Sequence, residues 1–137
     1  MDHKRIRVIM AVVIGLCAGV WTFVHLQGSE STEEKLAQTS KHLNARLPLN
    51  LDSNTRWDTT LPGPGNCLTY CYTLVNASKS DMDTNEFTAR IKPKLSLNYR
   101  TSPDMKLFRQ NRVTLRFTFK DKLGETVTTI EVSPDDL

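Results

Sequence analysis

Residues Asn66 to Asn76 read NCLTYCYTLVN, a run without a single charged side chain. In an extended chain alternate side chains point to opposite faces, so leucine and tyrosine share one face of this run while cysteine and threonine share the other. A strand that carries no charge on either face is typical of a position inside a sheet rather than at its edge. The run therefore predicts the central strand of a small sheet.

A second strand is predicted just before it. Residues Leu51 to Thr59 alternate Leu, Ser, Thr and Trp on one face with Asp, Asn, Arg and Asp on the other. Between the two strands lies LPGPG, Leu61 to Gly65, where two prolines lack a backbone donor and two glycines favour turns. We expect a β-hairpin with LPGPG as its loop.

The C-terminal part predicts a second hairpin. From Val113 to Lys120 apolar residues alternate with Thr, Arg and Lys, DKLG at Asp121 to Gly124 forms a turn, and Thr126 to Val132 returns. An earlier helix is indicated by the capping box of Ser31 and Glu34. Its apolar stripe ends where proline follows Leu47.

A helical region between the hairpins begins at Asp83, which forms a capping pair with Glu86. Pro93 lies inside this region and is expected to kink or end its first piece. Ser102 then caps a short helix from Pro103 to Gln110. The order helix, hairpin, helix pair, hairpin predicts an α+β domain with a four-stranded antiparallel sheet and the helices on one face.

Ahead of this domain lies VIMAVVIGLCAGVWTFV, Val8 to Val24, which has no charged side chain and follows Lys4, Arg5 and Arg7. As a helix it would be about 25 Å long, slightly short of a hydrocarbon core of ~30 Å. The basic residues favour an N-terminus in the cytoplasm. We therefore expect a cytoplasmic segment (1–7), a transmembrane helix (8–26), a tether (27–30) and an extracytoplasmic domain (31–137).

The alternative is a cleaved signal peptide. Only Gly28 offers a small residue near the end of the apolar run, and Leu26 occupies the position two residues before it, which makes a poor cleavage site. Both alternatives send the domain across the membrane. A retained helix would also present Gly15 and Gly19 at a Gly-xxx-Gly spacing, which favours close approach of two membrane helices and predicts a homodimer.

Two blocks of the sequence, LDSNTRWDTTLPGPGNCLTYCYTLVN (Leu51 to Asn76) and TSPDMKLFRQNRVTLRFTFKDKLG (Thr101 to Gly124), resemble a family of small, functionally uncharacterised bacterial proteins that are exported or membrane-anchored. The resemblance implies the same α+β architecture, a location in the bacterial inner membrane with the domain in the periplasm, and no catalytic residues to transfer. Where the family pattern has a cysteine before the second block, this chain has Arg100, and it has no cysteine after Cys71.

Enzymatic chemistry finds little support in the sequence. Outside the anchor region the only histidine is His42, and Cys67 and Cys71 stand four residues apart in a strand, ~13 Å, too far to form a disulfide with each other. No close-spaced metal ligands and no phosphate-binding loop are present. We expect no catalysis, no metal and no cofactor, with a thiol-dependent envelope factor using Cys67 or Cys71 as the alternative.

The chain carries a net charge of +3, and the segment from Phe87 to Lys122 is rich in Lys and Arg. Arg112, Arg116 and Lys120 recur every four residues and predict a basic stripe on one face of a strand, suited to lipid head groups, envelope polymers or an acidic protein. The alternative is a solvated face balanced by acidic residues nearby. Export excludes nucleic acid as a partner, and the expected function is non-catalytic: a single-pass membrane protein that presents a periplasmic interaction domain to the bilayer surface and to another envelope protein.

Overall fold

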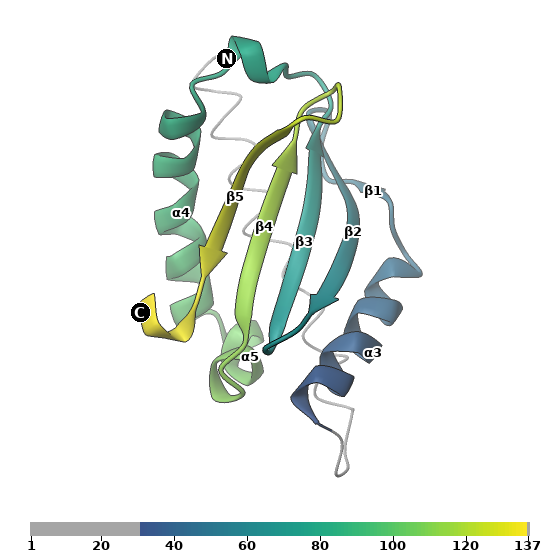
Figure 1. Cartoon of the computed structure of the whole chain (residues 1–137), viewed down its shortest axis with the longest axis vertical. Helices are drawn as coiled ribbons and strands as arrows, with labels where there is room; N and C mark the ends of the chain where they lie inside the picture. The colour runs from purple at the N-terminus through teal and green to yellow at the C-terminus, as the bar shows by residue number, and fades with distance from the viewer. Residues whose placement is uncertain (1–30, 137) are drawn as a thin grey trace.

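The computed structural model describes residues 31–136 (Figure 1). The principal elements follow one another in this order: α3 (Thr32–Asn44), β1 (Leu49–Asn50), β2 (Thr55–Gly63), β3 (Cys67–Leu74), α4 (Thr84–Thr101), α5 (Lys106–Gln110), β4 (Thr114–Lys120) and β5 (Thr126–Val132). Short 3₁₀ turns lie at Lys79–Asp81, Pro103–Met105 and Pro134–Asp136.

The sheet has five strands in the order β1-β2-β3-β4-β5, and β3 is central, as its sequence predicts. Both predicted hairpins are present, but β3 and β4 run parallel, so the sheet is mixed. The expectation of four antiparallel strands is therefore wrong. The reason is the connection: α4 runs back along the sheet, so β4 starts from the same end as β3. The fifth strand, β1, has only two residues and carries no recognisable pattern.

The first hairpin has a shorter loop than LPGPG predicts. β2 continues to Gly63, with Pro62 opposite Leu68, and the turn follows at Gly65 and Asn66, both with positive φ. The Thr60 N–H, two residues earlier, points away from β3 to Asn44, so the donor that Pro62 lacks would also face away from β3. Prolines are tolerated in strands at such outward-facing edge positions.

The predicted helix starts are confirmed. Ser31 and Glu34 form a complete capping box, and the Asp83 carboxylate accepts a hydrogen bond from the Glu86 N–H. Pro93, however, does not end the helical piece: α4 is continuous over 18 residues, and Pro93 lies on its exposed side. Buried Ile91 and Leu95 on either side hold the helix against the sheet, and such packing outweighs one missing backbone bond.

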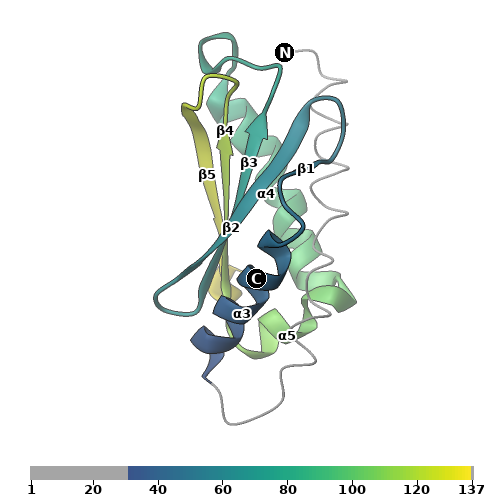
Figure 2. The ribbon, with the colours of Figure 1, turned by 90° about the vertical axis from the view of Figure 1, so that its right-hand side faces the viewer.

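All the helices lie on one face of the sheet (Figure 2). Beneath them is a layer of aromatic rings whose centroids are 5.2 to 6.5 Å apart, and Phe87 of α4 meets Phe119 edge-on at 5.3 Å. The rings on the sheet belong to Trp57, Tyr70, Tyr72, Phe117 and Phe119. Aromatic pairs of this kind add ~0.5–1.5 kcal/mol each beyond the burial of their area.

A polar cluster attaches α3 to the outer edge of β2. The Asn44 side chain accepts a hydrogen bond from the Thr60 N–H at 2.8 Å and donates to the Thr60 carbonyl at 3.0 Å. The Ser40 hydroxyl lies 2.7 Å from the Thr60 hydroxyl. The amide of Asn44 thus satisfies backbone groups of β2 that β1 is too short to reach.

The end of α4 is closed by Arg109 and Tyr99. The Arg109 guanidinium donates to the carbonyls of Tyr99 (2.7 Å) and Ser102 (2.8 Å), which satisfies acceptors that a helix end leaves unpaired. The Tyr99 hydroxyl donates to the Val113 carbonyl at 2.7 Å, and burial raises the pKa of this phenol to about 12. Tyr99 thereby links the last turn of α4 to the start of β4.

At the other end of the sheet a buried carboxylate, Asp121, connects two loops. It accepts hydrogen bonds from the backbone N–H groups of Lys79 (2.8 Å), Leu123 (2.8 Å) and Glu125 (2.9 Å). The bond from Lys79 is the main cause of a lowered pKa at Asp121. This one side chain fixes the β4–β5 turn against the connection that leads into α4.

Within residues 31–136 no helix is both long and apolar enough to cross a bilayer. The predicted cytoplasmic segment, transmembrane helix (8–26) and tether lie outside the described residues, as does the predicted dimer motif of Gly15 and Gly19.

Replacing Asp121 with Asn should lower the free energy of unfolding at pH 7. It should also reduce the loss of this free energy as the pH falls. Because the folded state lowers the pKa of Asp121, its contribution is complete above the unfolded value of about 3.9 and is lost as pH falls through the folded value. Urea unfolding from pH 7 to pH 2 measures this. Asp104→Asn, at an exposed carboxylate, is the control, and an unchanged pH profile in the Asp121 variant would contradict the assignment.

Replacing Pro93 with Ala should raise the free energy of unfolding by about 1–3 kcal/mol, because alanine restores a helical donor and removes the clash of the proline ring. The greater freedom of the unfolded alanine chain offsets part of this gain. Chemical unfolding, with Lys92→Ala at the adjacent exposed position as the control, tests it. A Pro93 variant no more stable than the wild type would refute it.

Candidate functional site

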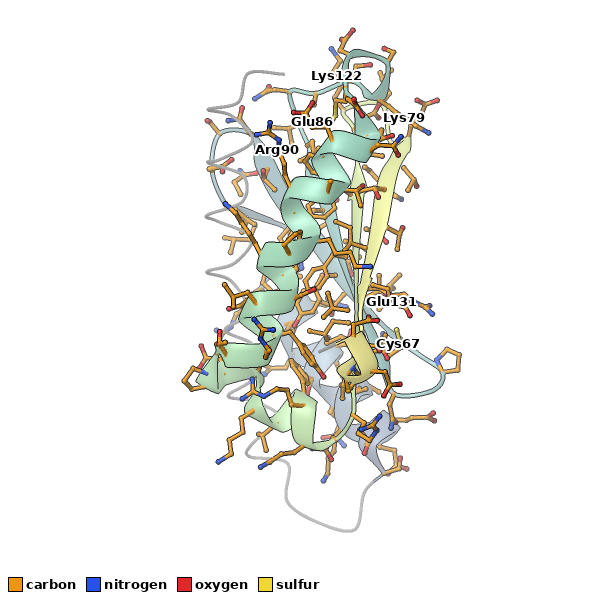
Figure 3. The ribbon with its side chains drawn as sticks, turned by 90° about the vertical axis from the view of Figure 1, so that its left-hand side faces the viewer. Cys67, Lys79, Glu86, Arg90, Lys122 and Glu131 are labelled. Carbon is orange, nitrogen blue, oxygen red and sulfur yellow. The ribbon has the colours of Figure 1, made fainter. Side chains whose placement is uncertain are left out.

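The face of the sheet opposite the helices is polar, and no described element covers it. Figure 3 shows Cys67 and Glu131 on this side, away from α4. We call it the open sheet face. Its residues on β2 to β5 include Arg56, Asp58, Thr59, Leu61, Cys67, Thr69, Cys71, Thr73, Arg116, Thr118, Lys120, Thr129 and Glu131.

The predicted basic stripe of Arg112, Arg116 and Lys120 is only partly assembled on this face. Arg116 and Lys120 lie on β4, but Arg112 precedes the strand, in a turn where its φ is 53°. Placing Arg112 on the strand was therefore wrong: the chain turns there with a positive φ, a conformation that favours glycine. Binding of an anionic partner by these residues stays a prediction.

Acidic neighbours neutralise two of the three cations. The Arg112 guanidinium lies 2.6 Å from a carboxylate oxygen of Asp135, and that of Arg116 lies 2.9 Å from Glu131, its partner in the β4–β5 register. The hydrogen bond that Arg116 donates to the Glu131 carboxylate raises the pKa of Arg116. Both pairs are exposed, and water and salt screen their attraction. Among the described residues, only Lys120 of the three forms no ion pair.

Both thiols are free and lie on the open sheet face, four residues apart on β3. Cys67 is buried opposite Gly63, while Cys71 is half-buried near Lys120 and Asp58. Burial raises the pKa of both thiols, and the neighbouring cations offset this only in part. The reactive thiolate form is therefore scarce at neutral pH.

Other groups that could carry acid–base chemistry are held in structural contacts or lie apart. Asp58 is bonded to Arg56 and Thr73, and Asp52 accepts hydrogen bonds from the Asn54 and Thr55 N–H groups, so these carboxylates do not form an acid–base pair. His42 is exposed on α3, on the helical side of the sheet, whereas the thiols lie on the other face. Within residues 31–136 no cluster of three His, Cys, Asp or Glu is suited to a metal ion.

The structure thus defines a small α+β domain with a one-sided mixed sheet. Residues 31–128 match the family described as "Domain of unknown function (DUF8479)", and the chain belongs to this family. This agrees with the expectation of a functionally uncharacterised family. No curated protein gives a significant match.

Solved structures with the same fold come from secreted and secretion-associated proteins. A Pseudomonas aeruginosa protein described as secreted aligns with a TM-score of 0.61 at 14% identity, over 76% of this chain and 94% of its own. The type II secretion pilotin EpsS from Vibrio vulnificus gives 0.59 at 12% identity (76% and 89%). The pilotin AspS from Vibrio cholerae gives 0.57 at 10% identity (77% and 92%). At these identities the likeness establishes a shared fold.

The two thiols should react slowly with Ellman's reagent at pH 7 in the folded protein, and faster as the pH rises toward 10. Cys71, the more exposed thiol, should react before Cys67. Cys67→Ser and Cys71→Ser variants assign the two phases, and the urea-unfolded chain gives the unprotected rate. A Cys71 rate at pH 7 equal to that of the unfolded chain would show an accessible thiol of ordinary pKa and contradict the assignment.

Proposed function

We propose that the chain is an exported, non-catalytic protein of the bacterial cell envelope whose domain binds another envelope protein. The observation that carries the proposal is the fold, which the chain shares over three quarters of its length with a protein described as secreted and with two type II secretion pilotins. The apolar run Val8 to Val24, with its preceding basic residues, supports export independently.

The chemistry of the described residues supports a binding role over a catalytic one. Both thiols have raised pKa values, the only described histidine is on the other side of the sheet, and the carboxylates Asp52 and Asp58 are held by hydrogen bonds within β2 and its approach. A nucleophile requires an adjacent base or a lowered pKa. The alternative of a thiol-dependent envelope factor therefore gains nothing from the geometry of Cys67 and Cys71.

The form of attachment follows from the fate of the N-terminal segment. A retained helix would hold the domain at the outer surface of the inner membrane, whereas cleavage would release it into the periplasm. The likeness to a protein described as secreted supports the released form more than the anchored one. In both forms the domain is extracytoplasmic.

Protease treatment of spheroplasts, with mass determination of the mature chain, tests this proposal. The domain should be digested from outside without lysis, because its export places all of residues 31–136 beyond the membrane. A mature chain shortened near Gly28 would establish release, and an intact membrane-bound chain would establish the anchor. Protection of the domain in spheroplasts, with digestion only after lysis, would refute export and with it the proposed function.

A further inference from the structure

The outer edge of β5 carries backbone groups that no described residue pairs. β5 is the last strand of the sheet, and in the described part of the chain it pairs with β4 alone. The Thr114 N–H donates to the Asn66 carbonyl beside β3, so the N–H groups of the alternate β4 residues between point toward β5. The β5 residues opposite those groups, Thr128, Ile130 and Val132, therefore direct their own backbone groups to β4.

The backbone groups of Thr129 and Glu131 point the other way, out of the sheet. Their two N–H groups and two carbonyls have no hydrogen-bond partner among the described residues, and both residues are exposed (Figure 3 views the molecule from this edge). The next outward residue, Ser133, is closed by the C-terminal turn, since its N–H donates to the Asp136 carboxylate and its carbonyl accepts from the Asp136 N–H, both at 3.0 Å. The free edge of β5 is thus a short one, with two donors and two acceptors.

Helix α4 lies beneath this free edge. Phe87 meets Phe119 of β4. About 100° further around the helix, the Thr88 hydroxyl donates to the Thr128 hydroxyl of β5 at 2.8 Å. A further 40° or so in the same sense leads to Lys92, which therefore lies beyond β5. Figure 1 shows α4 outside β5 at the margin of the sheet, and Figure 2 shows it on the helical side.

Lys92 lies level with the middle of the free edge. α4 and β5 run in the same direction (Figure 1). Lys92 stands ~6 Å along the helix from Thr88, about the rise of two strand residues, so it is level with Ile130, between Thr129 and Glu131. Its side chain is exposed and forms no ion pair with any residue of 31–136. We call Thr129, Glu131 and Lys92 the β5 ledge.

We infer that the β5 ledge binds an extended segment of another envelope protein, which adds a strand beside β5 and sets an acidic side chain over Lys92. This inference rests on the proposed function, since it names the surface and the kind of segment that would bind there. Backbone hydrogen bonds to an exposed sheet edge supply affinity, and the side chains of the added strand supply specificity.

A second copy of the chain does not fit the β5 ledge. Two β5 edges that pair antiparallel are related by a two-fold axis perpendicular to the sheet, which keeps both helical layers on the same side. Because α4 extends past β5, the two α4 helices would meet in the same space under the joined edge. A single extended segment brings no helix with it and leaves α4 in place as the floor of the site.

The test is a photo-crosslinker, p-benzoylphenylalanine, placed at Asn85 of the full chain in cells that carry the natural gene. Asn85 is exposed and lies about 60° beyond Thr88, on the same flank of α4 as Lys92. After irradiation the adduct is digested and its peptide sequenced by mass spectrometry. We expect a segment of another protein that contains Asp or Glu.

Proline at an outward position of β5 tests the backbone contact. Thr129→Pro removes one outward N–H and places a ring in the path of the added strand, so it should lower the adduct yield about tenfold or more. Thr129→Val is the matched control, because it loses the same hydroxyl but keeps the N–H, and it should retain the adduct. Thermal unfolding by circular dichroism identifies a Thr129→Pro chain that fails to fold, and Glu131→Pro, at the other outward N–H, then replaces it.

A charge reversal tests the chemistry of the segment. Lys92→Glu should lower the adduct yield several-fold, because it sets like charges against each other beneath the added strand. Lys106→Glu, at an exposed lysine of α5 that forms no ion pair with a described residue, makes the same charge change elsewhere and should retain the adduct.

The captured segment, made as a synthetic peptide, gives the sharpest measurement. Its affinity for the purified full chain in detergent is measured by fluorescence anisotropy after N-methylation of successive peptide residues, one at a time. In a strand only every second N–H faces the neighbouring strand, so every second N-methyl group should weaken binding at least tenfold and those between should leave it unchanged. An N-methyl series without this period of two would exclude strand addition.

The other outcomes overturn the inference. A phospholipid adduct at position 85, an adduct with a second copy of this chain, or a yield as high in Thr129→Pro as in Thr129→Val would each refute the β5 ledge. Crosslinkers at exposed Leu61 and Leu123 locate the error. A protein adduct from either of these without one from position 85 refutes the β5 ledge alone, whereas no protein adduct from any of the three refutes the proposed function too.

Discussion

The aromatic layer on the central strands is the constraint on which the rest of the structure depends. Tyr70 and Tyr72 of β3 stack on Phe117 and Phe119 of β4, and all four are buried on one face of the sheet. Rings of this size must be covered by other elements. The segment that connects β3 to β4 contains α4, which runs back along the sheet, and this return brings the two strands into parallel contact. The position of α4, the parallel pairing and the single helical layer follow from burying this one face.

Burying one face leaves the other to water, and the domain therefore offers two surfaces of different character. The open sheet face is rich in threonine, and two of its cations, Arg56 and Arg116, are paired with acids of the same face. On the outer side of α4, Arg90 pairs with Glu86, whereas Lys94 and Arg100 form no ion pair with any residue of 31–136.

Local signals in the sequence predict the elements well, and long-range pairing escapes them. The capping residues Ser31 and Asp83, the buried alternation of β3 and the C-terminal hairpin all follow from spacing and residue type. The parallel β3–β4 contact does not, because periodicity specifies which face is buried and not which strand lies alongside. In the candidate site, the sequence identifies the cations of the basic stripe but not their acidic partners. The pairing of Arg116 with Glu131 depends on the β4–β5 register, and the pairing of Arg112 with Asp135 depends on the C-terminal turn. From the sequence, Asp121 is an ordinary turn residue. Its three backbone donors come together only when the loop that contains Lys79 packs against the β4–β5 turn.

The side-chain amide of Asn44 affects whether another chain can add a strand at the β2 edge of the sheet. An exposed strand edge is a template on which other chains can add strands and aggregate. Along the outer edge of β2, Asn44 occupies the donor and acceptor of Thr60, and Pro62 has no donor to offer. A helix side chain and one proline thus block the addition of another strand along this part of the β2 edge, so backbone pairing with a second chain is prevented here by two local side-chain features.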